Sequence, residues 1–524
     1  MPQQNEATFS IFQFYLTLFS IGTLVMLLNI EFSAVNLALV PISKDIDVNL
    51  NDLQWVLSSY ILVWAALVVP AGRLADLYGK KLMLIIGILT FMIGSFVSGI
   101  ANHIGPLIMG RIIQGIGAAI LSAPAYGIIF SSAPARLQGT AMGIVAGIAG
   151  FGLAIGPSLA GYIIKDFSWR WIFYINVPLG VLVITAIFYL VPKSQNGKSH
   201  GKMNYGTSLL LILGLAGFVF GLNQIEVWGY KHSLLWIILI GSLCLLGIFY
   251  KLDQRSVHQT LPKSLLHHKT YRATLITMMS LAYIFALTLF MVSLYLQSTL
   301  RLSAYEAGIA LMFFSASYGI LSPIGGKITD KFGIQIPCAI GVLCLAAGLS
   351  LLGFSSEKST LLFLAFPLLL LGIGLGITFP AINTAMFKTV PPALMNTGSA
   401  LFTMVMMLGN TISVIASSSL LVFWSDFKLK GLLEKANITL TPEHYDILLK
   451  VISKAEHTKD QLQGFNEKEI PTLLSIIDQA FVKGFHLNMW IGVFMAFVAL
   501  YYIMRYFSAN AFQNQTSTPI MPVH

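Results

Sequence analysis

The chain has 524 residues, of which 56% are hydrophobic and only 10% are charged. An ordinary soluble domain contains about 45–50% apolar and about 25% charged residues, so this composition excludes a water-soluble protein. The net charge of +10 could indicate a nucleic-acid partner, and the placement of the cations must decide this. The three cysteines all lie inside apolar runs and give no disulfide framework.

Apolar runs long enough to cross a bilayer repeat from one end of the chain to the other. A helix needs about 20 apolar residues to cross a hydrocarbon core of about 30 Å. Fourteen such runs are predicted, at 12–40, 53–74, 82–101, 106–130, 140–164, 171–191, 205–223, 234–250, 273–297, 307–325, 336–354, 361–383, 397–423 and 485–507. The chain is therefore predicted to be an all-α polytopic membrane protein with fourteen transmembrane helices.

Lysine and arginine are distributed unevenly between the two sides of the predicted membrane. The loops after even-numbered spans, with the C-terminal tail, contain sixteen of them, and the short loops on the other side contain six. Since positive charge collects on the cytoplasmic side, both termini are predicted to be cytoplasmic. Topology thus explains the basic excess, and the nucleic-acid interpretation is removed.

A decapeptide is repeated in the two halves of the chain. Gly72–Lys81 follows the second span, and Gly326–Gln335 follows the tenth, 254 residues later. Two copies of a six-span unit separated by two extra spans account for this offset. We therefore expect an N-terminal six-helix bundle at 1–191, a linker with two extra transmembrane helices at 192–270, and a C-terminal six-helix bundle at 271–524.

The segment 424–483 within the second bundle is the one stretch that resembles a soluble region. Thr441-Pro442-Glu443 is a typical helix start, and it precedes an amphipathic run from Tyr445 to Ile452. We expect an extracytoplasmic helical hairpin. It either packs on its own bundle as a spacer or acts as a lid or partner-binding element.

Two ionisable side chains stand out inside the spans, Glu31 in the first and Arg111 in the fourth. Charge is costly at membrane depth, so each is a functional candidate. Glu31 points away from the helix face that carries Asn36, so the first helix must be enclosed by protein. A carboxyl in such a place can gain and lose a proton as its surroundings change, which a proton carrier requires. The alternative is a fixed structural ion pair, and for Arg111 too a structural role stays open.

The repeated decapeptide is predicted to be a conformational latch between helices at the cytoplasmic face. A glycine at each end allows a turn, and Asp76 either caps a helix end or pairs with a neighbouring cation. The predicted latch residues are Gly72, Arg73, Asp76, Gly79, Lys80 and Lys81, with Gly326, Asp330 and Gly333 in the second copy.

Two further sets of residues are predicted from patterns within the spans. Gly152, Gly156, Pro157 and Gly161 in the fifth span combine close helix approach with a proline kink, which serves packing more often than mechanism. Polar stripes and aromatic side chains near span ends give candidates for a substrate cavity, although such aromatics are usually interfacial anchors. These candidates are Asn36, Tyr60, Trp64, Gln114, Tyr295, Gln297, Met406 and Asn410.

Several kinds of chemistry are absent from the sequence. It contains no HExxH or CxxC motif, and Gly197-Lys198-Ser199 lacks the first glycine of a nucleotide-binding loop. We therefore expect no metal, no organic cofactor and no enzyme activity. Any energy would come from an ion gradient.

These motifs together resemble the major facilitator superfamily, in its fourteen-span drug–proton antiporter branch of the EmrB/QacA type. Gly72–Lys81 resembles the loop signature of that family, and Leu107–Ala119 resembles its fourth-span signature. The glycines and Pro157 of the fifth span are similar to the antiporter signature. Gln54–Tyr60 and Trp169–Gly180 are similar to segments typical of the fourteen-span branch.

The resemblance implies two six-helix bundles that rock around a midplane cavity and export cargo against proton entry. Glu31 then occupies a position where relatives usually have aspartate, and Arg111 matches an arginine thought to assist proton movement. Leu77 departs from the family pattern because it replaces a basic residue of the latch. Met406 and Met407 lie where some exporters of cationic drugs carry acids, so a neutral, amphipathic or anionic cargo is expected.

From this resemblance we expect proton-coupled export of lipophilic or amphipathic small molecules, in the form of multidrug efflux. A transporter of one endogenous metabolite, such as a siderophore, in either direction is the alternative. A non-transporting receptor or scaffold is an alternative of another class. The expected location is the bacterial cytoplasmic (inner) membrane, and the expected partners are lipid, a small-molecule substrate and, in a Gram-negative host, a periplasmic adaptor protein.

Overall fold

The computed structural model describes residues 11–48, 50–191, 203–436, 438, 440–441, 444–445, 447–448 and 470–507. Fourteen helical stretches in these residues are long and apolar enough to cross a membrane. The predicted all-α class and the predicted number of spans are thereby confirmed.

The helices follow the predicted order. Most spans are a single helix, namely α1 (Ile11–Ile46), α2 (Leu50–Tyr78), α3 (Lys80–Gly99), α4 (Ile104–Ser132), α5 (Gln138–Asp166), α8 (Tyr205–Trp228), α9 (Ser233–Asp253), α12 (Ala304–Phe332), α13 (Gln335–Leu352), α14 (Leu361–Thr389), α15 (Met395–Lys435) and α17 (Ile470–Tyr506). The sixth span is divided into α6 (Arg170–Tyr174) and α7 (Asn176–Leu190), and the ninth joins α11 (Lys269–Leu294) to a π-helical turn, η2 (Tyr295–Thr299). Short helices η1 (Ala135–Leu137), α10 (Lys263–His267) and η3 (Pro392–Leu394) precede α5, α11 and α15.

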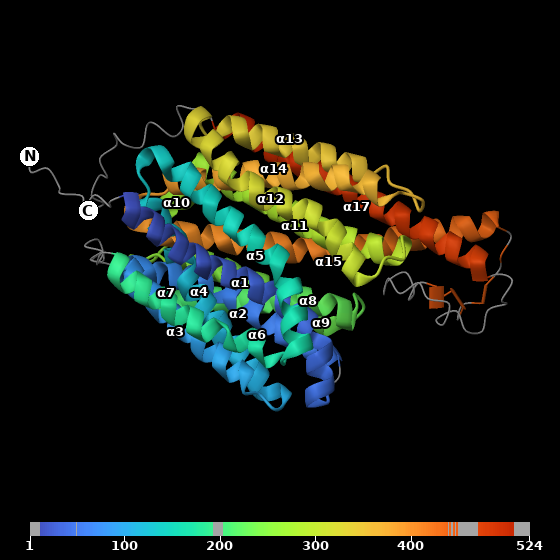
Figure 1. The fold of residues 1–524 in the computed structure, drawn as a ribbon, viewed down its shortest axis with the longest axis horizontal. Coiled ribbons are helices and arrows are strands. Elements are labelled where there is room, and N and C mark those ends of the chain that lie inside the picture. The colour runs from blue at the N-terminus through green and yellow to red at the C-terminus, as the bar shows by residue number, and fades with distance from the viewer. Residues whose placement is uncertain are drawn as a thin grey trace, which may run out of the picture.

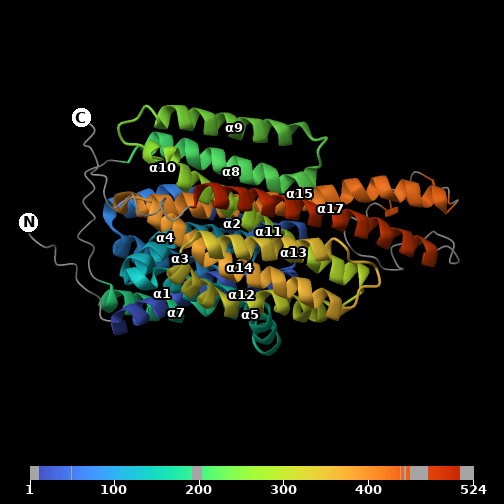
Figure 2. The ribbon, with the colours of Figure 1, turned by 90° about the horizontal axis from the view of Figure 1, so that it is seen from above.

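The helices form two bundles with a pair of helices beside them. One bundle contains α1–α7, and the other contains α11–α15 and α17. The bundles converge at the end where α1 begins and α17 ends, and they diverge toward the other end (Figure 1). In the second view α9 is the outermost helix, and α8 lies between α9 and the two bundles (Figure 2).

Helix α8 contacts both bundles. Val219 packs against Ala65 of α2 and Met407 of α15, so α8 covers the line where these two helices meet. Its other side is held to α9 through glycines, since Cβ atoms at Gly214 and Gly221 would lie within 2.8 Å of the side chains of α9. Close approach through small residues is the usual way in which helices associate inside a bilayer.

Helices α15 and α17 are longer than predicted. They extend beyond the other helices at the diverging end, as both views show (Figures 1 and 2). An ion pair one turn apart, between Lys430 and Asp426 at 3.3 Å, supports the extended part of α15. The Ser425 hydroxyl donates to the Ala480 carbonyl of α17 at 3.1 Å and joins the two helices. Most of the expected helix at 441–452 lies outside the described residues.

Candidate functional site

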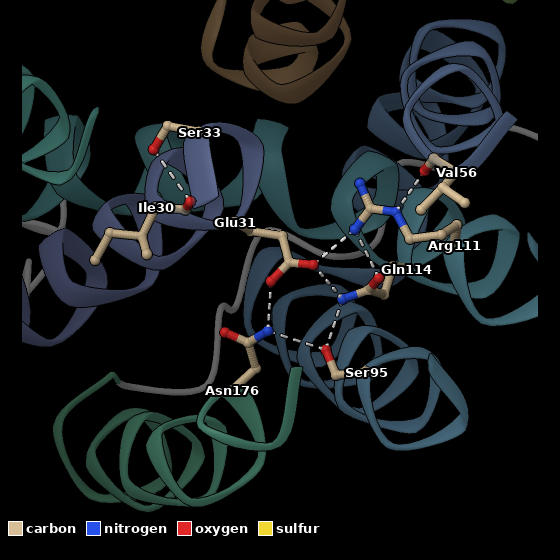
Figure 3. A network of polar contacts seen from close by, with 8 residues as sticks. All are labelled: Ile30, Glu31, Ser33, Val56, Ser95, Arg111, Gln114 and Asn176. Atoms are coloured by element: carbon tan, nitrogen blue, oxygen red, sulfur yellow. Dashed lines mark hydrogen bonds and ion pairs between the residues drawn. The ribbon is translucent and has the colours of Figure 1, made fainter. Parts of the chain in front are cut away.

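Glu31 lies at the centre of a buried polar network in the first bundle. Only 1% of the residue is exposed. Its Oε1 atom accepts hydrogen bonds from Arg111 Nη1 at 2.6 Å and from Gln114 Nε2 at 3.0 Å. Its Oε2 atom accepts from Asn176 Nδ2 at 2.7 Å (Figure 3). The carboxyl thus accepts hydrogen bonds from three side chains on two other helices. Protein encloses it and keeps its charge away from lipid.

Arg111 would keep partners even without the carboxylate. Its Nε donates to the Val56 carbonyl of α2 at 2.8 Å, and Nη1 donates to Gln114 Oε1 at 2.9 Å. The guanidinium also stacks on the Tyr60 ring, with 4.3 Å between Cζ and the ring centroid. A cation over an aromatic face is attracted by the electrons of the ring. Arg111 is therefore fixed in position by α2 and α4 together.

Glycines bring α3 and α4 close enough to complete the network. A Cβ atom at Gly94 would lie 2.5 Å from the Gln114 backbone nitrogen, and one at Gly117 would overlap the backbone of Phe91. At this spacing Ser95 Oγ of α3 accepts from Gln114 Nε2 at 2.7 Å. Helix packing without bulky side chains thus sets the position of the Gln114 amide.

Sequence reasoning did not assign a role to Asn176 or Ser95. Asn176 is the first residue of α7 and follows α6 after one residue, Ile175. Its Nδ2 atom lies 3.3 Å from Ser95 Oγ, in addition to its bond with Glu31. The sequence does contain a signal for Asn176, because it is an amide side chain inside the apolar run 171–191, two residues before Pro178. The predicted span at 171–191 is confirmed, since Arg170–Leu190 form one span and Ile175, between α6 and α7, keeps a helical backbone.

Two polar residues near Glu31 on α1 bond to their own helix instead. Asn29 Nδ2 donates to the Val25 carbonyl at 2.8 Å, and Ser33 Oγ donates to the Asn29 carbonyl at 3.0 Å. Asn36 lies on an exposed part of the helix surface.

The glycines of the fifth span face α1. A Cβ atom at Gly152 would lie 2.8 Å from the Met26 carbonyl, one at Gly156 would overlap Ser33 Oγ, and Gly161 is near Leu37. The side chain of Pro157 lies outside the described residues. These glycines therefore allow α5 to approach the helix that carries Glu31.

The repeated decapeptides contact the opposite bundle, as a latch between bundles requires. Asp76 at the end of α2 caps the start of α15. Its Oδ1 atom accepts from Asn396 N at 3.0 Å and Nδ2 at 2.7 Å, and Oδ2 accepts from Thr397 N at 2.8 Å and Oγ1 at 2.6 Å. A carboxylate at a helix N-terminus satisfies free backbone N–H groups and interacts favourably with the helix dipole.

The second copy makes the equivalent contact in the opposite direction. Asp330 at the end of α12 accepts from Gly139 N at 2.7 Å and from Thr140 N at 2.7 Å and Oγ1 at 2.6 Å, at the start of α5. Both contacts lie at the same end of the molecule, which is called the latch end below. Each bundle therefore caps one helix of the other.

A second repeat, which sequence analysis missed, supplies the capped ends. The segment Pro134–Thr140 precedes and begins α5, and Pro391–Thr397 precedes and begins α15. Proline, leucine and threonine occupy the first, fourth and seventh positions of both segments. A search for a second match at nearly the same offset as the decapeptides would have found it.

The glycines and cations of the decapeptides have different tasks. Gly79 and Gly333 have φ angles of 98° and 79°, which side chains other than glycine rarely adopt. A Cβ atom at Gly72 would lie 2.6 Å from the Asn396 carbonyl, and one at Gly326 would overlap the carbonyl of Gly139. These glycines permit the turns and the close approach of the bundles.

Among the cations, Lys80 is half-buried, and its Nζ lies 3.3 Å from Met395 Sδ. Lys81 Nζ donates to the Phe188 carbonyl at 2.8 Å, at the end of α7 in the same bundle. Arg73 is buried. Lys81 therefore secures α7, whereas Lys80 and the two aspartates contact the opposite bundle.

The predicted cavity residues do not form one cluster. Tyr60 and Trp64 lie next to the Glu31 network, with 5.5 Å between their ring centroids. Tyr295 lies at the diverging end instead, where its hydroxyl donates to the Ser356 carbonyl at 2.6 Å and its ring stacks on Phe485.

The remaining cavity candidates also differ in their surroundings. Gln297 is exposed and donates to Ser293 Oγ at 2.9 Å. Met406 and Asn410 are half-buried on α15, and Asn410 Oδ1 is a buried acceptor without a hydrogen-bond donor among the described residues. A groove of about 840 Å³ lies between Ser355–Glu357, α15 and α17, away from Glu31.

Comparison with known proteins identifies relatives along most of the chain. A family model described as the Major Facilitator Superfamily matches residues 19–414. The multidrug resistance protein Stp of Mycobacterium tuberculosis is 28% identical over 477 residues, which cover 90% of this chain and 87% of that protein. The tetracenomycin C resistance and export protein of Streptomyces glaucescens is 24% identical over 396 residues, covering 76% and 74%.

The fold is shared with solved transporter structures. The proton:xylose symporter XylE bound to 6-bromo-6-deoxy-D-glucose matches with a TM-score of 0.58 and 13% identity, over 94% of this chain and 96% of that one. This likeness supports the arrangement of two bundles. The proteins in these comparisons are resistance and transport proteins, not enzymes.

Proposed function

Because the chain belongs to the major facilitator superfamily, we propose that it is a proton-coupled antiporter that exports lipophilic or amphipathic small molecules, with multidrug efflux as its function. The single observation that carries this proposal is the Glu31 carboxyl, enclosed by protein and bonded to Arg111, Gln114 and Asn176. The family supplies transport of a small molecule through the bilayer. The network supplies a group that can carry a proton.

Proton transfer at Glu31 would be coupled to the movement of the bundles. As the bundles tilt, the network becomes accessible from one side and then from the other, and a change in its contacts changes the affinity of the carboxyl for a proton. Per 100 mV, one inward charge supplies about 2.3 kcal/mol, enough for a roughly fiftyfold gradient of a neutral cargo. In this proposal no organic cofactor or metal takes part, and the proton gradient is the source of energy.

The two aspartate caps support alternating access. Asp76 and Asp330 join the bundles at the latch end, while the bundles diverge at the other end. With both termini cytoplasmic in a bacterial cytoplasmic membrane, as the cation distribution predicts, the two caps close this state on the cytoplasmic side. Opening to the cytoplasm would require both caps to release their helices.

The proposed cargo is neutral, amphipathic or anionic. Glu31 is the buried carboxylate at the centre of the first bundle in the described spans. A cargo with two positive charges would need a second buried acid, and methionines, Met406 and Met407, occupy the positions on α15 where it would be expected. A periplasmic adaptor forms no part of the proposal, because much of the segment that would receive it lies outside the described residues.

Transport of one particular compound is the second candidate function. The relative in Streptomyces glaucescens is named for export of one compound, tetracenomycin C, whereas Stp is named for multidrug resistance. A narrow cargo range in the assay below would favour this alternative.

The test uses purified protein in proteoliposomes with an imposed pH gradient. Uptake into inverted vesicles is measured for Nile red, ethidium and tetracenomycin C, together with proton release when each compound binds. We expect Glu31→Gln to abolish both gradient-driven transport and proton release. Glu434→Gln, which removes an exposed acid at the end of α15, is the matched control and should behave like the wild type. Undiminished transport by Glu31→Gln would refute the proposal.

A further inference from the structure

The hydrogen bonds around Glu31 divide into two kinds. Arg111 can only donate, so it can bond to a carboxylate but cannot accept the O–H of a carboxylic acid. Gln114 Nε2, which contacts the same oxygen, is likewise a donor there. Asn176 is the partner of Oε2, at 2.7 Å, and an amide side chain has both a donor and an acceptor.

A half-turn of the Asn176 amide would exchange these two groups. In the structure Nδ2 faces both Glu31 Oε2 and Ser95 Oγ, at 2.7 and 3.3 Å. After rotation about χ2, Oδ1 would occupy this place and could accept a hydrogen bond from a protonated Oε2. The Ser95 hydroxyl can follow this change, because it can accept from Nδ2 in one state and donate to Oδ1 in the other.

The rest of the network stays satisfied when the carboxyl is neutral. Arg111 keeps the Val56 carbonyl and Gln114 Oε1 as acceptors, and Gln114 Nε2 keeps Ser95 Oγ. Among the described residues, the charged or titratable side chains that face Glu31 are Arg111 of α4 and, more distantly, Tyr60 of α2. On α5, Gly152 and Gly156 face this part of α1 and bring no titratable group.

We propose that Asn176 is the positioning residue that allows Glu31 to exist in both protonation states, by presenting its NH₂ group to the carboxylate and its carbonyl group to the acid. This inference rests on the proposed function, since it assumes that Glu31 takes up a proton. A hydronium ion gives a proton to Oε2 and leaves a water molecule, the carboxylate loses its charge, and the amide turns so that Oδ1 accepts the new O–H. Proton release reverses these steps. Leaving a buried polar group without its partner is costly, so a site without this amide would favour one state.

The test measures the vibration of the protonated carboxyl itself. Infrared difference spectra between high and low pH are recorded for the full chain in lipid nanodiscs, and the Glu31 band is identified by its loss in Glu31→Gln. We expect the wild-type band at the frequency of a hydrogen-bonded acid. In Asn176→Leu, which keeps a similar volume without hydrogen-bonding groups, the band should move to higher frequency because the O–H has lost its acceptor.

Two further variants make the result specific. Asn176→Gln keeps an amide and should return the band toward the hydrogen-bonded frequency. Asn223→Leu replaces an asparagine that bonds to the Val219 carbonyl of its own helix, and it should leave the band unchanged. An unchanged band in Asn176→Leu would overturn the inference. If that variant does not fold, a wild-type band at the frequency of a free acid would overturn it equally.

The same spectra separate this inference from the proposed function. If Glu31→Gln removes no titrating band, Glu31 does not take up a proton in this range and the proposed function fails as well. If the band is present but does not respond to Asn176, the inference about Asn176 fails alone.

Discussion

The Glu31 carboxylate receives bonds from two kinds of side chain, an arginine fixed in place and amides that can change their orientation. The geometry of Arg111 is specific to a guanidinium, because Nε and Nη1 contact acceptors on three different residues. Lysine has a single ammonium at the end of a flexible stem and cannot reproduce this fork. The identity of this side chain therefore matters beyond its charge.

We expect Arg111→Lys to reduce gradient-driven transport at least tenfold, although the positive charge is kept. The reason is that one ammonium cannot contact Val56, Gln114 and Glu31 in the same arrangement. Initial rates in proteoliposomes check this, with Lys388→Arg, an exchange of exposed cations at the end of α14, as the control. Full activity of Arg111→Lys would mean that only the charge is required.

A second ion pair lies outside the spans, at the diverging end of the first bundle. Asp45 Oδ2 accepts from Arg170 Nη1 at 2.5 Å and from Trp169 Nε1 at 3.1 Å. The hydrogen bonds from Arg170 and then Trp169 hold the pKa of Asp45 below its usual value of 3.8. Because the pKa of Asp45 is lower in the folded than in the unfolded protein, its bonds stabilise the fold fully at pH values above 3.8. This stabilisation is lost as the pH falls through the pKa of the folded state.

We therefore expect Asp45→Asn to lower the melting temperature slightly at neutral pH. The effect should correspond to less than about 1 kcal/mol, because the pair is exposed to solvent. The difference from the wild type should shrink as the pH falls below the usual pKa of 3.8. Thermal unfolding in detergent at several pH values measures this difference in melting temperature. A difference that grows toward low pH would contradict the lowered pKa of Asp45.

At the scale of elements, glycine spacing between α3 and α4 determines whether the network can form. A Cβ atom at Gly117 would overlap the backbone of Phe91, which cannot move aside as a flexible side chain could. We expect Gly117→Ala to cost about 1–3 kcal/mol of stability by overpacking. It should also reduce transport, because α3 carries Ser95 to Gln114.

Gly241→Ala is the matched control for this prediction. Gly241 lies in α9, and a Cβ atom there would meet nothing within 4 Å. The free energy of unfolding, measured by titration with a denaturing detergent, should fall in Gly117→Ala and not in Gly241→Ala. Equal values for the two variants would show that the close approach of α3 and α4 is not required.

At the scale of the whole molecule, the two caps hold the same end closed from opposite sides. Asp76 belongs to the first bundle and caps α15, whereas Asp330 belongs to the second and caps α5. Each cap consists of charge-assisted hydrogen bonds, which contribute about 1.5–3 kcal/mol each. Loss of either cap should favour states that are open at the latch end.

We expect Asp76→Ala and Asp330→Ala each to lengthen the distance across the latch end, and the double variant to lengthen it further. Spin labels at Arg136 and Lys388, exposed positions on opposite bundles, report this distance by pulsed electron resonance. Glu434→Ala, at the other end, should leave the distribution unchanged. An unaltered distribution in the double variant would remove the caps from the mechanism.

The sequence alone determined which parts of the chain cross the membrane, because hydropathy is a local property and each span must be apolar along its own length. It likewise singled out Glu31 and Arg111, since a charge inside an apolar run is visible without any partner. The roles predicted for these residues stay predictions. The repeated decapeptides were visible for the same reason, as a local pattern that occurs twice.

Only the tertiary structure decided which groups these residues meet. Asp76 contacts Thr397, 321 residues further along the chain, and Asn176 reaches Glu31 across 145 residues. Such contacts depend on how bundles and helices pack, and no local pattern contains that information. The length of α15 was missed for a related reason. Contacts of individual side chains, such as Lys430 with Asp426 and Ser425 with the Ala480 carbonyl, lie in the extended part of this helix, and hydropathy does not reveal them.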